Sequence, residues 1–354
     1  MPTIVAADAC FPSRYVAQED VAREFLRVAG GRGEATPERI RRFFTSVGVN
    51  GRHMALPIDA YPRLGGFAER SALWLEHARE LGAQAVRGAL ARAGLEPADI
   101  SLFASCTVTG ITAPSLDARL MTAIGGFKSD CRRVPLFGLG CVGGAAGLAR
   151  VADHLRAFPH HAALLLCVEL CSLTFQLSDT SIANVIASAL FGDGAACVVL
   201  VGDEHPLATR GPSIADTRSV LFDHTEGTMG WDIVDTGFRI VLSGSVPEIA
   251  RGPFSHAARD FLAAHGLSPG DVSRYIAHPG GPAVIDAVEQ GLGLAPGALD
   301  VSRRSLAAIG NLSSASVLVL LRDVLHGGDA RPTGPSLLFA MGPGFCAELV
   351  LLRW

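Results

Sequence analysis

One cysteine stands where a thiol could do chemistry. Cys141 lies between an apolar run at residues 134–139 and a segment from Gly143 in which apolar residues recur at helical spacing. The pattern predicts a strand, a sharp turn and a helix, with the thiol at the turn. Free backbone N–H groups and the positive end of the helix dipole would stabilise a thiolate there. The alternative is a buried structural cysteine, which is the commoner fate of this residue type.

An internal repeat connects this cysteine with a histidine and an asparagine. Residues 94–106 (GLEPADISLFASC) and 266–278 (GLSPGDVSRYIAH) share glycine, leucine, proline, aspartate and serine at one constant spacing, and the second stretch ends at His278. At nearly the same spacing Cys141 aligns with Asn311. The elements that carry these residues are therefore expected to be equivalent parts of two related units.

A third match extends the repeat to the domain level. Residues 190–194 (LFGDG) align with residues 338–342 (LFAMG), and each is expected to lead into a strand. Three matches in the same order predict two copies of one α/β unit, at residues 1–210 and 211–354, related by a pseudo-twofold axis.

Such a duplication would bring three reactive side chains together. The strand-to-helix turns of Cys141 and Asn311 would face each other, and His278 would follow a neighbouring strand. The carboxyl ends of strands are where α/β folds place their chemistry. A thiol, an imidazole and a carboxamide supply a nucleophile, a base or cation, and a hydrogen-bond donor. Read locally, Asn311 is instead a helix N-cap and His278 an ordinary turn residue.

The composition of the chain excludes several classes of protein. The 354 residues are 49% hydrophobic and 18% charged, which is typical of a folded protein with a large core. A net charge of −4 without a long basic run argues against nucleic acid as a partner. We expect no membrane span and, from the start of the chain, no export signal, hence a cytoplasmic location. The 8 scattered cysteines, without CxxC pairs, predict reduced thiols and no metal site.

The chain resembles the type III polyketide synthases, the chalcone-synthase-like branch of the thiolase fold. The resemblance covers nearly the whole chain and is densest in five stretches: Gly140–Gly144, Ala189–Ala196, Ile276–Pro282, Gly310–Ala315 and Gly342–Gly344. It implies duplicated αβαβα halves, a homodimer, and acyl-CoA and malonyl-CoA as substrates, with no metal or redox cofactor. It also implies catalytic roles for Cys141, His278 and Asn311.

The resemblance further suggests which residues bind the substrate. Phe191 and Phe238 match the two gatekeeping phenylalanines of the family, with core packing as the alternative. Arg52, with Arg41 and Arg42, lies in the region that resembles the coenzyme A entrance, with solvated surface as the alternative. Small or medium residues are expected to line the cavity wall and open a tunnel for an alkyl chain: Val108, Thr109, Ala113 and Thr174.

The expected reaction loads an acyl-CoA starter, here a fatty acyl group, on Cys141. Decarboxylative condensation with malonyl-CoA extends it, and cyclisation gives a pyrone or resorcinol. Ala340-Met341 replaces the usual Gly-Phe in the last loop, which affects the shape of the cavity. The alternatives are an initiating 3-ketoacyl synthase that uses a carrier protein, against which the HPGGP context of His278 argues, and an inactive thiolase-fold partner subunit. A hydroxymethylglutaryl-CoA-synthase-like enzyme would need a catalytic glutamate, for which there is no convincing match.

Overall fold

The computed structural model describes residues 1–29, 35–327 and 331–354. Its helices are α1 (Gln18–Ala29), α2 (Pro37–Ser46), α3 (Phe67–Ala93), α4 (Leu116–Ile124), α5 (Gly143–Ala157), α6 (Ile182–Leu190), α7 (Val246–Ile249), α8 (Ser255–Ala263), α9 (Pro282–Leu292), α10 (Asp300–Ile309) and α11 (Ser314–His326). Its strands are β1 (Thr3–Cys10), β2 (Arg14–Ala17), β3 (Gly51–Met54), β4 (Ile100–Thr107), β5 (Arg132–Phe137), β6 (Ala162–Leu170), β7 (Asp193–Val201), β8 (Ser213–Leu221), β9 (Met229–Val234), β10 (Gly237–Leu242), β11 (Arg274–Ala277), β12 (Ser336–Gly342) and β13 (Cys346–Arg353).

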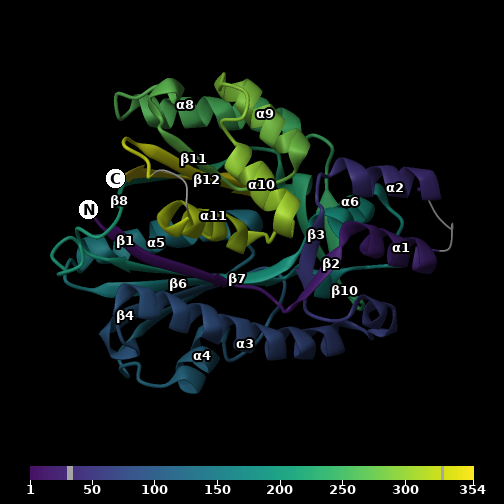
Figure 1. The fold of residues 1–354 in the computed structure, drawn as a ribbon, viewed down its shortest axis with the longest axis horizontal. Helices are drawn as coiled ribbons and strands as arrows, with labels where there is room; N and C mark the ends of the chain where they lie inside the picture. Colours follow the sequence, from purple (N-terminus) through teal and green to yellow (C-terminus); the bar gives the residue numbers. More distant parts are fainter. Residues whose placement is uncertain (30–34, 328–330) are drawn as a thin grey trace.

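The elements stack in five layers (Figure 1). Helices α3 and α4 cover one half-sheet, α8 and α9 cover the other, and α5 and α11 lie between the two. The first half-sheet has the order β5-β4-β6-β7-β1 and the second β11-β12-β13-β8, and they meet where Thr3 of β1 pairs with Ser213 of β8. This is the duplicated αβαβα arrangement that the repeat predicts.

The two half-sheets use the same pairing pattern. Strand β6 lies parallel to β4 and antiparallel to β7, just as β12 lies parallel to β11 and antiparallel to β13. By position, β7 therefore corresponds to β13. Residues 190–194 lead into β7, whereas residues 338–342 lie within β12, so the third sequence match is wrong. Short apolar strings with glycine recur in many buried strands, which is why the match arose. The two halves also differ in one element along the chain, since strand β5 precedes the turn of Cys141 whereas helix α10 precedes the loop of Asn311.

The structure confirms the repeat of residues 94–106 at residues 266–278, including its backbone conformation. Helix α3 ends at Gly94 in the left-handed conformation (φ 72°), and Gly266 has φ 67° at the same position of the second unit. In each unit a short 3₁₀ turn follows, where the carboxylate of Asp99 or Asp271 accepts the backbone N–H three residues earlier, at 2.8 and 2.7 Å. Strands β4 and β11 then begin. Identical residues at these positions therefore produce the same turn and strand entry.

The central helices pack unusually closely at their N-terminal ends. A Cβ atom on Gly144 of α5 would lie 2.4 Å from the backbone oxygen of Ser314 in α11. Only glycine permits this approach. Because α5 and α11 touch both half-sheets, 10 of the 15 residues of α5 and 9 of the 13 residues of α11 are buried, and all of these are apolar or small. The close contact presses together the loops that precede the two helices, and these loops carry Cys141 and Asn311.

Smaller elements gather at one end of the layers, where α1, α2, α6, β2, β3 and β10 lie close to one another (Figure 1). Strands β9 and β10 form a hairpin outside the large sheet. In the part of the chain that the structure describes, no helix has the length and apolar character needed to cross a membrane.

Candidate active site

A cavity of about 520 Å³ opens where the central loops meet the smaller elements. Cys141, His278 and Asn311 all line it, as does Phe191. The three side chains proposed for catalysis come from both halves of the chain, so the duplication brings them together as expected. Most of the wall is apolar and includes Phe43, Val47, Ile186, Leu190, Met229, Ile240, Leu242, Val246, Met341 and Phe345. Such a largely apolar wall with a few converging polar groups is typical of a small-molecule site.

Cys141 sits at the predicted turn. Residues Gly140–Val142 form a 3₁₀ turn between β5 and α5, and the positive φ of Gly140 (53°) lets the chain reverse there. The thiol is 7% exposed, and its Sγ lies 3.7 Å from the hydroxyl oxygen of Ser313. Burial raises the pKa of Cys141 to about 12, with the Ser313 hydroxyl acting in the opposite direction. Burial thus favours the neutral thiol, in opposition to the helix terminus from which the sequence predicts a thiolate.

Asn311 is held so that its amide can donate into the cavity. Its Oδ1 accepts the backbone N–H of Ser313 at 2.8 Å, and a hydrogen bond from the Asn311 side chain also acts to lower the pKa of the Cys141 thiol. Ser313 itself has a positive φ of 48° and is the N-cap of α11. The N-cap alternative for Asn311 is therefore wrong, and its oxygen instead holds the loop that leads into α11.

His278 directly follows β11 and is fixed through its backbone, whose N–H donates to the carbonyl of Phe339 at 2.9 Å. Its side chain is 6% exposed, and neither Nδ1 nor Nε2 has a hydrogen-bond partner among the described residues. Burial lowers the pKa of His278 to about 3, so the imidazole is neutral. Buried polar atoms are rarely left without partners. Because both ring nitrogens of His278 lack a partner at the cavity wall, the imidazole is available to hydrogen-bond a substrate.

A buried carboxyl near the site was missed in the sequence. Glu169 at the end of β6 accepts hydrogen bonds from the hydroxyls of Ser314, Thr109 and Thr107 and from the backbone N–H of Val108. It is fully buried but does not line the cavity. Burial raises the pKa of Glu169 to about 7. In the sequence it appeared only as a charge that interrupts an apolar run, and its role in joining β6 to the start of α11 depends on tertiary contacts.

Only one of the two predicted gatekeeping phenylalanines lines the catalytic cavity. Phe191 lines the cavity, but Phe238 packs edge-on against Phe67, with ring centroids 5.3 Å apart, and lines a separate small cavity. Ile240, two residues further along β10, contributes to the catalytic cavity instead. Alternate residues of a strand share one face. Phe238 and Ile240 therefore lie on the same face of β10. The position of the β9–β10 hairpin decides which of the two side chains reaches the catalytic cavity.

The four residues expected to line an alkyl tunnel do not border the catalytic cavity. Val108 and Thr109 are buried beside Glu169, and the Thr109 hydroxyl also accepts from the indole N–H of Trp74 at 3.2 Å. Thr174 is buried and donates to the backbone of Cys171, while Ala113 lies exposed on the surface. Thr109 lines the small cavity that Phe238 also lines, while the other three side chains are used for packing or face solvent, so none of the four lines the catalytic cavity.

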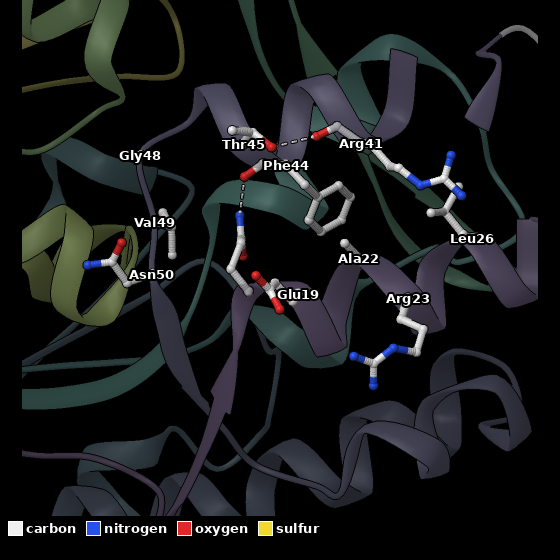
Figure 2. Close-up of a pocket in the computed structure, with 11 residues that line it drawn as sticks. Glu19, Ala22, Arg23, Leu26, Arg41, Phe44, Thr45, Gly48, Val49 and Asn50 are labelled. Carbon is white, nitrogen blue, oxygen red and sulfur yellow. Dashed lines mark hydrogen bonds between the residues drawn. The ribbon is translucent and has the colours of Figure 1, made fainter. Parts of the chain in front are cut away.

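The expected role of Arg52 in binding coenzyme A is also wrong. Its side chain is 0% exposed and donates to backbone carbonyls inside the protein, because β3 lies beneath α6. Arg41 lines a different open groove, of about 660 Å³, between α1 and α2, where Figure 2 shows it with Arg23.

The cavity-facing side of α2 carries other arginines. Its residues Phe43 and Ser46 line the cavity. The Arg39 guanidinium lies 5.7 Å from the centroid of the Phe43 ring, and Arg42 precedes Ser46 by one helical turn. Arg39 and Arg42 therefore lie close to the face of α2 that borders the cavity, which the sequence alone did not indicate.

The described residues contain no group of three or more histidine, cysteine, aspartate or glutamate side chains that could hold a metal ion.

Family comparisons cover the whole fold. The chalcone and stilbene synthase N-terminal domain matches residues 1–204, and the C-terminal domain of the same family matches residues 214–354. A 1,3,6,8-tetrahydroxynaphthalene synthase from Streptomyces peucetius subsp. caesius is 48% identical, with 99% of this chain and 93% of that protein covered. A putative chalcone synthase from Bacillus subtilis (strain 168) is 35% identical, covering 100% and 99% of the two chains.

A solved structure gives the same result. The crystal structure of 1,3,6,8-tetrahydroxynaphthalene synthase from Streptomyces coelicolor A3(2), a bacterial type III polyketide synthase, has a TM-score of 0.93 at 30% identity and 99% coverage of both chains. Matches to both domains of the family, together with this agreement in fold, leave one conclusion. The chain belongs to the chalcone and stilbene synthase family and is a type III polyketide synthase of the thiolase fold.

Proposed function

We propose that Cys141 carries the growing polyketide and that His278 and Asn311 stabilise the enolate formed from malonyl-CoA. The observation that carries this assignment is the free hydrogen-bonding capacity at the cavity wall. The ring nitrogens of His278 have no partner among the described residues, and the Asn311 side chain, whose oxygen accepts from Ser313, also hydrogen-bonds the Cys141 thiol. Donors aimed at developing negative charge are each worth about 3–4 kcal/mol in a water-poor site.

Loading begins from a neutral pair. The Cys141 sulfur bonds to the thioester carbonyl carbon of acyl-CoA while His278 accepts the thiol proton. The bond from that carbon to the coenzyme A sulfur then breaks, and the proton passes from His278 to the departing thiolate. A neutral imidazole is the form that can accept this proton, which agrees with the lowered pKa of His278.

Extension then adds two carbons. Malonyl-CoA loses its free carboxylate as CO₂, and the electron pair of that bond forms an enolate whose oxygen accepts hydrogen bonds from His278 and Asn311. The enolate carbon attacks the Cys141 thioester, and the Cys141 thiolate leaves. The lengthened chain, now on coenzyme A, returns to Cys141 for the next cycle. This route uses no metal or redox cofactor.

The preferred substrate is malonyl-CoA as both starter and extender, with a polyhydroxylated aromatic product. The relative at 48% identity is named for tetrahydroxynaphthalene, which supports this choice. A fatty acyl-CoA starter leading to a pyrone or resorcinol is the second candidate, supported by the largely apolar cavity wall. Arg39 and Arg42 on α2 are proposed to bind the coenzyme A phosphates. The active assembly is proposed to be a homodimer, to be checked by light scattering at micromolar concentration.

The deciding experiment identifies products by mass spectrometry. The enzyme is incubated with malonyl-CoA alone, with malonyl-CoA and a series of acyl-CoA starters, and with the same starters on an acyl carrier protein. An aromatic product from malonyl-CoA alone, absent with Cys141→Ala, is the expected result. Products that require a long acyl-CoA would favour the second candidate. Activity only with carrier-bound substrates would contradict the proposal.

A further inference from the structure

A buried arginine holds the end of the helix that precedes Phe191. The last four carbonyls of an α-helix lack intrahelical partners. At the end of α6, the guanidinium of Arg52 supplies donors to two of them, Ser188 O at 2.8 Å and Ala189 O at 2.5 Å. It also donates to the carbonyl of Phe191 at 2.7 Å. A cation at a helix C-terminus is further stabilised by the helix dipole.

Gln18 completes this arrangement from α1. Its Oε1 accepts from Arg52, and its Nε2 donates to the carbonyls of Ala189 at 2.9 Å and Phe44 at 2.8 Å. Both Gln18 and Arg52 are buried. The pair therefore links α1, α2 and β3 to the end of α6, with each carbonyl held by a donor that has little freedom to move.

The same segment holds Asn311 through its backbone. The N–H of Asn311 donates to Leu190 O, and Asn311 O accepts from the N–H of Gly192, both at 2.9 Å. Phe191 and Asn311 thus form an isolated β-bridge. The backbone of Asn311 has its position set by residues 190–192, and Arg52 sets the position of those residues from the other side.

We infer that Arg52 is a positioning residue for the decarboxylation step, acting through the Phe191–Asn311 bridge to place the Asn311 amide at the enolate oxygen. The inference rests on the proposed donor role of Asn311. Arg52 does not line the cavity and reaches its wall only through the carbonyl of Phe191, so its effect is on the geometry of the donor and not on the binding of coenzyme A.

The test is a double-mutant cycle on malonyl-CoA decarboxylation, followed as acetyl-CoA formation. Arg52→Met should lower kcat by about ten- to a hundredfold with little change in KM, because displacing a catalytic group by about 1 Å can cost a hundredfold. In an Asn311→Ala background the same change should have little further effect, since residues that act through one another are not additive. Arg52→Lys should restore part of the activity by keeping some of the donors.

Arg70→Met is the matched control. Arg70 also donates to two backbone carbonyls, those of Gly65 and Leu173, but to neither side of the Phe191–Asn311 bridge. This variant should decarboxylate at the wild-type rate. Where Arg52→Met does not fold, as judged by circular dichroism, Gln18→Met replaces it; it removes the donor to Ala189 and should show a smaller effect with the same loss of additivity.

Two results would overturn the inference: a wild-type kcat in folded Arg52→Met, or an equal loss of kcat with and without Asn311. Failure of the underlying function is seen separately. If Asn311→Ala alone decarboxylates normally, Asn311 is not an enolate donor, and the positioning role falls with it whatever Arg52→Met does.

Discussion

Replacing Asn311 with aspartate separates its two roles. The aspartate keeps an oxygen at the position of Oδ1, where it can still accept the Ser313 N–H, now at 2.8 Å, and so preserve the loop before α11. The NH₂ donor is lost. At pH 8 the hydrogen bond from Ser313 favours the ionised carboxylate, which also repels the enolate.

The expected loss is large. Removing one donor to a developing oxyanion costs about 2.7–4 kcal/mol, or roughly a hundred- to a thousandfold in kcat. Repulsion between two negative charges adds to this, at about 4 kcal/mol for a separation near 4 Å with an effective dielectric of 20. Asn311→Asp should therefore decarboxylate malonyl-CoA at least about a hundredfold more slowly, while Asn311→Ala loses only the donor and the acceptor.

The assay measures acetyl-CoA released from malonyl-CoA at saturating substrate. Circular dichroism serves as the control, because both variants should keep the wild-type fold. A decarboxylation rate within about tenfold of wild type in Asn311→Asp would refute the reasoning, and Asn311 would then serve only to hold the loop before α11.

Three further outcomes are expected. Gly144→Ala should lower the free energy of unfolding by about 1–3 kcal/mol, because the new Cβ would stand 2.4 Å from Ser314 O; an unchanged urea midpoint would contradict the close helix contact. Ile240→Phe should alter the product profile seen by mass spectrometry, whereas Phe238→Leu should affect stability alone; the reverse pattern would restore Phe238 as a gatekeeper. Burial raises the pKa of Glu169 from 4.5 to about 7 in the folded protein. Its contribution to the free energy of unfolding is therefore fully present below pH 4.5 and is lost as the pH rises through about 7. Glu169→Gln should make urea midpoints less dependent on pH across this window, and an unchanged pH profile would count against the buried carboxyl.

Local rules in the chain were enough to predict the duplicated architecture. The glycine, proline and aspartate of residues 94–106 and 266–278 encode a helix end, a capped turn and a strand start whatever surrounds them. Once two such units are paired, the turns at Cys141 and Asn311 must meet, and His278 lies close by. The convergence of these three residues on one cavity therefore followed from the repeat.

Side-chain environments could not be predicted in this way. The period-two pattern of β10 assigns Phe238 and Ile240 to one face, and only the docking of the β9–β10 hairpin decides which of them reaches the cavity. Arginine is usually exposed, and the short strand β3 gives no sign of burial in the sequence. The Arg52 side chain is nevertheless buried against α6.

The sequence by itself determined the fold class, the family and the three residues that meet at the cavity, because these depend on motifs that act locally and on their order along the chain. Only the tertiary structure decided which neighbours surround each side chain. Contacts between segments far apart in the chain bury Arg52 against the end of α6, place Ile240 in the cavity wall and desolvate the Cys141 thiol, because burial is set by tertiary packing and not by local sequence.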